Sequence, residues 1–105
     1  MVVLATVERF FPFDHAAAQG HFPGNPIIPA AVLLSEAIDA VESAFGLRLS
    51  PLRIKSVKFP APVRPGDRVL IEYQRAREDS IRIVCRVGAT AVLVGEVIWD
   101  ASTGA

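Results

Sequence analysis

The stretch GHFPGNPIIPAAVLLSEAI, residues 20–38, joins a proline-rich loop to the start of an apolar helix. Pro23, Pro26 and Pro29 each fix φ near about −65° and bias the preceding residue towards extended conformations, so helix is not expected before Pro29. Pro29 itself suits the first turn of a helix, because its missing N–H has no partner to lose there. The pattern predicts a rigid loop that runs directly into a helix at residue 30.

The predicted helix reads AAVLLSEAIDAVESAFG, residues 30–46. Gly46 is a suitable C-terminal stop. The apolar residues recur at helical spacing, at positions 30, 34, 37, 38, 41 and 45. The other side carries Ser35, Glu36, Asp39, Glu42 and Ser43.

Strand patterns lie on both sides of this helix. Residues 2–11 are rich in β-branched and aromatic types and predict a strand, and Asp14 is suited to cap a short helical turn after it. After the helix, four runs alternate with period two, and turn residues separate them; the runs are residues 52–59, 67–76, 80–87 and 91–99. The short connections between the last three runs predict an antiparallel meander. A lone helix must bury its apolar stripe against a sheet, so we expect one α+β domain over residues 1–105, with a helix wrapped by about five antiparallel strands.

Composition excludes several classes of protein. The 105 residues are 51% hydrophobic and 21% charged, as in folded proteins, and no apolar run approaches the length of a membrane span. The N-terminus lacks the pattern of a signal peptide, so we expect a cytoplasmic protein. A net charge of zero gives no argument for nucleic acid binding. The single Cys85 lies in an alternating run and is expected to be a small buried residue.

The two histidines differ in their surroundings. His15 is expected to lie at the surface without a direct role, whereas Gly20 and Pro23 restrain the backbone around His21, as the placement of a general base requires. The first helical turn adds free N–H groups near Ala30, Ala31 and Val32, which can hold a developing oxyanion. A base beside such donors can remove a proton α to a carbonyl, although a rigid loop that merely enters a core helix explains these residues equally well. No metal-ligand spacing or phosphate-binding loop is present.

Two motifs, in the expected order, resemble those of the 3-hydroxyacyl-[acyl carrier protein] dehydratases of hot-dog fold. The first is His21-Phe22-Pro23-Gly24 with Pro26 and Pro29, followed by the apolar helix. The second is VKFPAPVRPGD, residues 57–67, which is similar to the strand and PxPGD turn of that family. The resemblance covers most of the chain and implies the same fold, a helix wrapped by an antiparallel sheet, dimerised so that two sheets join.

The resemblance also implies a lyase reaction without a cofactor. The motif histidine, here His21, would remove the C2 proton of a 3-hydroxyacyl thioester, and amides at the helix start would polarise the thioester carbonyl. Substrate-binding positions would then be Phe22, Gly24, Ala30 and Ala31, with Ala30 where the family usually has glycine. The family's carboxylic acid lies fourteen residues after the histidine, which here is Ser35, and Glu36 follows one step later. Because one helical step turns a side chain by about 100°, both Ser35 and Glu36 stay open as candidates for the acid.

Three functions follow from this resemblance as hypotheses. The first is dehydration of a 3-hydroxyacyl thioester, carried on acyl carrier protein or CoA, in the synthesis of fatty acids, related lipids or polyenes. The second is a non-catalytic acyl-thioester-binding subunit that has lost the acid, and the third is a thioesterase. We expect a homodimer or higher oligomer, because a curled sheet has edges that tend to be paired. Residues 48–105 carry ten basic and six acidic side chains, which would suit an acidic carrier protein.

Overall fold

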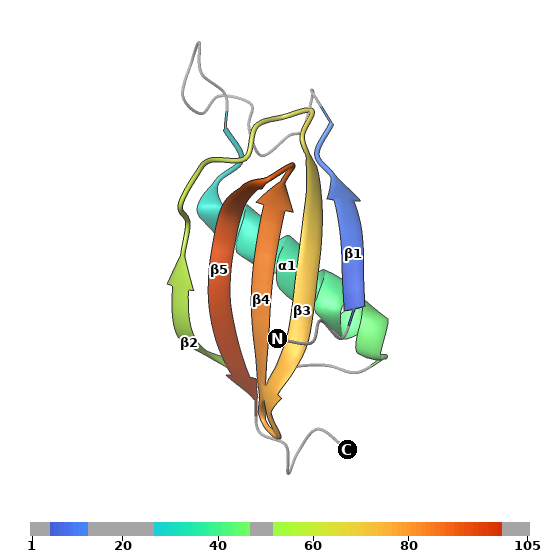
Figure 1. The fold of residues 1–105 in the computed structure, drawn as a ribbon, viewed down its shortest axis with the longest axis vertical. Coiled ribbons are helices and arrows are strands. Elements are labelled where there is room, and N and C mark those ends of the chain that lie inside the picture. Colours follow the sequence, from blue (N-terminus) through green and yellow to red (C-terminus); the bar gives the residue numbers. More distant parts are fainter. Residues whose placement is uncertain (1–4, 13–26, 47–51, 100–105) are drawn as a thin grey trace.

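One helix crosses one face of a five-stranded sheet (Figure 1). The computed structural model describes residues 5–12, 27–46 and 52–99. Within these ranges, no helix has the length and apolar character needed to cross a membrane. The elements are β1 (Ala5–Phe10), α1 (Ala30–Phe45), β2 (Leu52–Lys58), β3 (Arg68–Arg77), β4 (Ser80–Val87) and β5 (Thr90–Trp99). The predicted fold class, a helix on a curved antiparallel sheet of about five strands, is therefore confirmed.

The strand order in the sheet is β1-β3-β4-β5-β2, with every pair antiparallel. The meander predicted for the last three strands is confirmed as β3, β4 and β5, because short turns let consecutive antiparallel strands pair. The two remaining strands lie at opposite edges: β1 pairs with β3, and β2 pairs with β5. The sequence pattern did not predict which edge each of them takes.

The core lies between α1 and the concave face of the sheet. In β3, side chains alternate strictly between exposed and buried at the start of the strand, with Val69, Ile71 and Tyr73 buried. From the helix, the buried residues are Leu33, Ala37, Ala40 and Val41. Cys85 is buried as predicted, and desolvation by burial raises the pKa of its thiol from 9.0 to about 12.

The predicted apolar stripe of the helix was partly wrong. Leu34 and Ile38 were placed on the buried side, but both are only half-buried, while Leu33 and Ala40 are buried instead. The reason is that α1 presents apolar side chains to two different surroundings, the sheet and a surface hollow described below. An apolar pattern with period 3.6 cannot distinguish these two surroundings.

The helix begins and ends as predicted. Pro29 precedes its first residue, and Gly46 ends it in the left-handed conformation at φ 67°, with its N–H donating to the carbonyl of Glu42. Glycine adopts this conformation without the steric cost that other residues meet.

Candidate active site

Several of the expected site residues lie outside the described part of the chain. His21, Phe22 and Gly24 of the proline loop are among them, and so are His15 and the turn after Asp14. The described part of the candidate site consists of the N-terminal half of α1 and the segments packed beside it. Ala30, Ala31, Ser35 and Glu36 belong to this part.

The start of α1 has backbone N–H groups that lack a backbone acceptor among the described residues. The carbonyl of Pro29 accepts hydrogen bonds from the N–H groups of Val32, at 3.0 Å, and Leu33, at 3.1 Å. The expectation that the N–H of Val32 is free was therefore wrong, because a tight first turn uses it. Within the described residues, the N–H groups of Ala30 and Ala31 have no backbone acceptor. The first turn contains no acidic side chain, so the positive end of the helix dipole is not neutralised there.

A backbone bridge holds this helix start in place. The N–H of Ile28 donates to the carbonyl of Val63 at 2.7 Å, in an isolated antiparallel bridge. Val63 belongs to the second motif, so the bridge joins the two motifs two residues before the helix begins. Both side chains are buried, and this burial fixes the position of the bridge within the core.

The turn at the end of the second motif, PVRPGD at residues 62–67, is ordered by its own hydrogen bonds. A carboxylate oxygen of Asp67, Oδ2, accepts the backbone N–H of Arg64 at 2.8 Å, and the N–H of Asp67 donates to the carbonyl of Arg64 at 3.0 Å. Gly66 adopts φ 96°, which favours glycine. The N–H of Phe11 also donates to the carbonyl of Asp67 at 3.0 Å, so the turn is tied to the end of β1. The aspartate and glycine of this motif therefore have structural roles.

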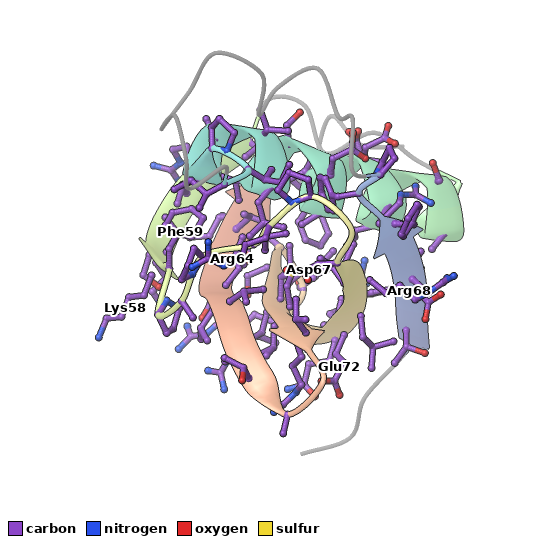
Figure 2. All side chains as sticks on the ribbon, turned by 90° about the horizontal axis from the view of Figure 1, so that it is seen from above. Lys58, Phe59, Arg64, Asp67, Arg68 and Glu72 are labelled. Carbon is purple, nitrogen blue, oxygen red and sulfur yellow. The ribbon has the colours of Figure 1, made fainter. Side chains whose placement is uncertain are left out.

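An apolar hollow of about 300 Å³ lies between the helix start and the segment after β2. Leu33 contributes a buried side chain, whereas Phe59 remains 38% exposed. Figure 2 shows Phe59 on the side of the molecule where α1 begins. The lining residues are Ile27, Ile28, Ala30, Leu33, Phe59, Pro60, Ala61, Pro62 and Val63. Because none of these side chains is charged, the hollow suits an aliphatic group.

A second hollow, of about 380 Å³, follows the outer side of α1. Its lining combines the apolar side chains of Leu34 and Ile38 with Ser35, Asp39 and Glu42. Ala31 lines this hollow and Ala30 lines the apolar one, so both hollows reach the first turn of the helix. Ser35 is exposed here on the side of the helix that faces away from the sheet.

Glu36 points in a different direction from Ser35. Its carboxylate lies 3.8 Å from the guanidinium of Arg9 on β1, and the same guanidinium lies 3.6 Å from the carboxylate of Asp39. Glu36 does not line the second hollow. The structure therefore separates the two candidates for the acid, with Ser35 at the hollow and Glu36 paired towards β1.

Two features of this site were missed by sequence reasoning. Arg9 is the only basic residue among residues 1–47, but its distance in sequence from Glu36 gives no sign that the two meet. The apolar hollow combines residues from both motifs. The only sign of it in the sequence is Phe59, the single aromatic residue of the second motif. In the described ranges, no three His, Cys, Asp or Glu side chains gather as metal ligands would.

Comparison with known proteins gives a family match over nearly the whole chain. Residues 4–94 match the family model described as ApeI-like, ApeI dehydratase. The 3-hydroxyacyl-[acyl-carrier-protein] dehydratase FabZ of Sodalis glossinidius is 35% identical, over 86% of this chain and 64% of that protein. The enzyme of the same name from Pectobacterium atrosepticum is 32% identical over the same shares. The chain thus spans a little under two thirds of the length of these relatives.

Solved structures share the fold at low sequence identity. The dehydratase heterocomplex ApeI:P from Xenorhabdus doucetiae has a TM-score of 0.74 at 19% identity, over 89% of this chain and 83% of that chain. A probable thioesterase from Bartonella henselae has a TM-score of 0.67 at 13% identity, over 99% of this chain and 96% of that chain. The (R)-hydratase from A. caviae has a TM-score of 0.58 at 19% identity, over 91% and 93%. Dehydratases, hydratases and thioesterases thus share this architecture, so the fold alone does not select a reaction.

Proposed function

The chain belongs to the ApeI-like dehydratase family, and on that premise we propose that it dehydrates a 3-hydroxyacyl thioester, carried on acyl carrier protein, to the 2-enoyl thioester. The observation that carries this proposal is the start of α1, where Ala30 lines an apolar hollow and Ala31 a polar one, and where the N–H groups of both have no backbone acceptor among the described residues. An elimination at a thioester needs donors for the carbonyl oxygen and room for substrate on either side of it.

In the proposed reaction, the thioester carbonyl oxygen accepts hydrogen bonds from the N–H groups of Ala30 and Ala31. His21 removes the proton from C2, and the negative charge that develops on the carbonyl oxygen is stabilised by these donors and the helix dipole. The electron pair of the C2–H bond then forms the C2=C3 double bond as the C3–O bond breaks. The departing hydroxide takes up the proton that His21 removed from C2 and leaves as water, which restores the neutral His21, and the apolar hollow holds the acyl chain.

Ser35 is the residue that we propose beside the departing hydroxyl group. It lines the polar hollow next to Ala31, whereas the carboxylate of Glu36 is paired with Arg9. A serine hydroxyl can hydrogen-bond to the leaving water but is a much weaker acid than a carboxyl group. Since a positioned acid contributes about 10² to 10⁴ in rate, we expect turnover below that of a dehydratase with a carboxylic acid at this position.

The test is interconversion of 3-hydroxyacyl and 2-enoyl thioesters by the purified chain. We expect turnover in both directions with carrier-protein or CoA thioesters, and its loss in His21→Ala. Substrates of several acyl chain lengths are tested, so that a preference for one length is not mistaken for inactivity. No interconversion with any of them would refute the proposal.

A non-catalytic acyl-binding subunit is the second candidate function. The observation that favours it is the hydroxyl of Ser35 at the position of the family's acid. This alternative predicts that the chain binds thioesters without turnover and that His21→Ala changes nothing measurable. Thioesterase activity, the third hypothesis, is supported only by the shared fold and would release free thiol in the same assay.

The assembly that we propose is a homodimer or higher oligomer that pairs through β2. The support is the position of β2 at one end of the strand order, with β5 on one side only among the described residues. Light scattering on the purified chain tests this, and a monomer would refute it. A cytoplasmic location stays a prediction from the sequence, to be checked by cell fractionation.

A further inference from the structure

We propose that the apolar hollow limits the acyl chain of the substrate to about twelve carbons and that Leu33 is the residue that sets this limit. The inference rests on the proposed function, in which the hollow holds the acyl chain. It adds which substrates fit and which side chain decides it.

The hollow has an open rim and a closed floor among the described residues. At the rim, Ala30 and Phe59 are exposed. At the floor, Ile28 and Leu33 are each 3% exposed, and Val63 is 1% exposed. These three residues also belong to the core, so the hollow ends where the close-packed core begins.

The backbone closes part of this floor. The N–H of Ile28 donates to the carbonyl of Val63 at 2.7 Å, which ties the chain before α1 to the segment after β2. Figure 1 shows that segment running beside the start of α1. An acyl chain cannot pass between the two without breaking this hydrogen bond and leaving buried polar groups unpaired. Leu33 takes no part in the bridge, so its side chain can be shortened while the bridge stays in place.

The side chain of Leu33 separates the hollow from the interior of the helix face. Side chains of an α-helix tilt towards its N-terminus, so Leu33 leans from the first turn towards the hollow. Ala37 follows one turn later on the same face and is fully buried. Because Ala37 is small, shortening Leu33 would extend the hollow along α1 in the direction of Ala37.

The volume of the hollow gives the number of carbons that fit. It measures about 300 Å³. A methylene group needs about as much room as a water molecule in the liquid, about 30 Å³, so on the order of ten methylene groups fill the hollow. With C1 and C2 at the helix start, the longest chain that fits has about twelve carbons. Carbons beyond this length stay outside the hollow and add no buried apolar surface.

The test measures kcat/KM for 3-hydroxyacyl thioesters with acyl chains of four to sixteen carbons. While the hollow fills, each added methylene group should raise kcat/KM by up to about fourfold, because its apolar surface leaves water. The rise should end at about twelve carbons. In Leu33→Ala, which removes three carbons of the side chain, the rise should end about three carbons later.

A second variant shortens the hollow without making a cavity in the core. Ala61 lines the hollow from the segment after β2 and is half-buried. Ala61→Leu adds three carbons to this wall, so the rise in kcat/KM should end about three carbons earlier. This variant keeps the proposal testable if Leu33→Ala fails to fold, and circular dichroism checks the fold of each variant.

The matched control is Leu93→Ala, the same substitution at a fully buried position of β5. Leu93 does not line the hollow, so the control should lower stability as Leu33→Ala does but leave the chain length at which the rise ends unchanged. Three results would each overturn the inference: a rise in the wild type that continues to sixteen carbons, an unchanged end in Leu33→Ala and Ala61→Leu, or an equal shift in Leu93→Ala.

A binding measurement separates this inference from the proposed reaction. Saturated acyl-CoA thioesters lack the 3-hydroxyl group and cannot be dehydrated, but their acyl chains fill the same hollow. Their affinity, measured by calorimetry, should rise with chain length to the same end in each variant. A chain that shows this limit in binding but dehydrates no thioester would refute the proposed function and leave the limit standing. Dehydration at every length without a limit would do the reverse.

Discussion

Ser35 and Glu36 are adjacent in the chain, but they have different neighbours in the structure. Ser35 lines the polar hollow beside Ala31, whereas Glu36 is paired with Arg9. The pair with Arg9 is at the surface, with the two side chains 33% and 41% exposed, so it orients Glu36 more than it stabilises the fold. At the residue scale, the helical turn between two neighbours gives their side chains different surroundings.

Changes at these two positions should therefore have different effects on activity. We expect Ser35→Glu to raise kcat/KM for dehydration, because it places a carboxylic acid where we propose that the hydroxyl group departs. Glu36→Gln should change kcat/KM little and lower the free energy of unfolding by less than about 1 kcal/mol. Steady-state kinetics and urea titration measure the two effects.

Ser35→Ala is the matched control, because it removes the hydroxyl without adding an acid. A rate for Ser35→Glu no higher than that for Ser35→Ala would contradict the assignment of Ser35. A large loss of turnover in Glu36→Gln would instead identify Glu36 as the acid.

At the scale of elements, β2 depends on one residue of its neighbour β5. Its pairing with β5 contains an irregularity between Ile54 and Ser56, next to the position where Val57 pairs with Gly95. A Cβ at Gly95 would lie 2.9 Å from the carbonyl oxygen of Ser56 and 3.3 Å from Cγ2 of Val57. The first distance involves backbone, which cannot move away as a flexible side chain does. The close approach of β2 to β5 thus requires glycine at this position.

Gly95→Ala should destabilise the protein and loosen β2. Forcing extra atoms into such a contact costs about 1–3 kcal/mol, which a lower urea midpoint would reveal. Hydrogen exchange should quicken in β2 more than in β3 and β4. The control is Thr90→Ala, at an exposed position of β5, the strand that contains Gly95. Its free energy of unfolding should lie within about 0.5 kcal/mol of that of the wild type. Equal stability of Gly95→Ala and the wild type would contradict the close approach.

At the scale of the whole molecule, one core joins the helix to the concave face of the sheet. Cys85 lies in the middle strand of that core with no exposed surface. Burial raises the pKa of its thiol from 9.0 to about 12, because the thiolate would lose its hydration inside the core. Ionisation of this thiol is therefore linked to unfolding of the whole domain.

This linkage predicts a loss of stability in alkali. Below pH 9 the thiol is protonated in both the folded and the unfolded state, so its contribution is fully present. Between about pH 9 and 12 the unfolded chain loses the proton while the folded chain keeps it, and stability falls as the pH rises, by roughly 1 kcal/mol per pH unit.

Urea titrations of the wild type and Cys85→Ala across this pH range measure the effect. Cys85→Ala should be less stable at neutral pH because of the smaller side chain, but the difference from the wild type should shrink above pH 9. A difference that stays constant with pH would contradict the linkage.

The sequence by itself determined the elements and, within the described residues, their boundaries to within one residue. The prolines up to Pro29 and the glycine at 46 limit the helix, and period-two alternation with turn residues between the runs marks the strands, because these signals act over a few neighbouring residues. The motifs at 21–29 and 57–67 also indicated the family, which the match over residues 4–94 confirms.

Only the tertiary structure decided which distant parts of the chain come together. It placed β1 and β2 at opposite edges, joined Ile28 to Val63, and turned Glu36 towards Arg9 and away from the hollow lined by Ser35. These arrangements depend on contacts between residues that are distant in sequence, and no local periodicity carries that information. The pairing of β2 with β5 is of the same kind, since the close approach at Gly95 exists only once the two strands have met.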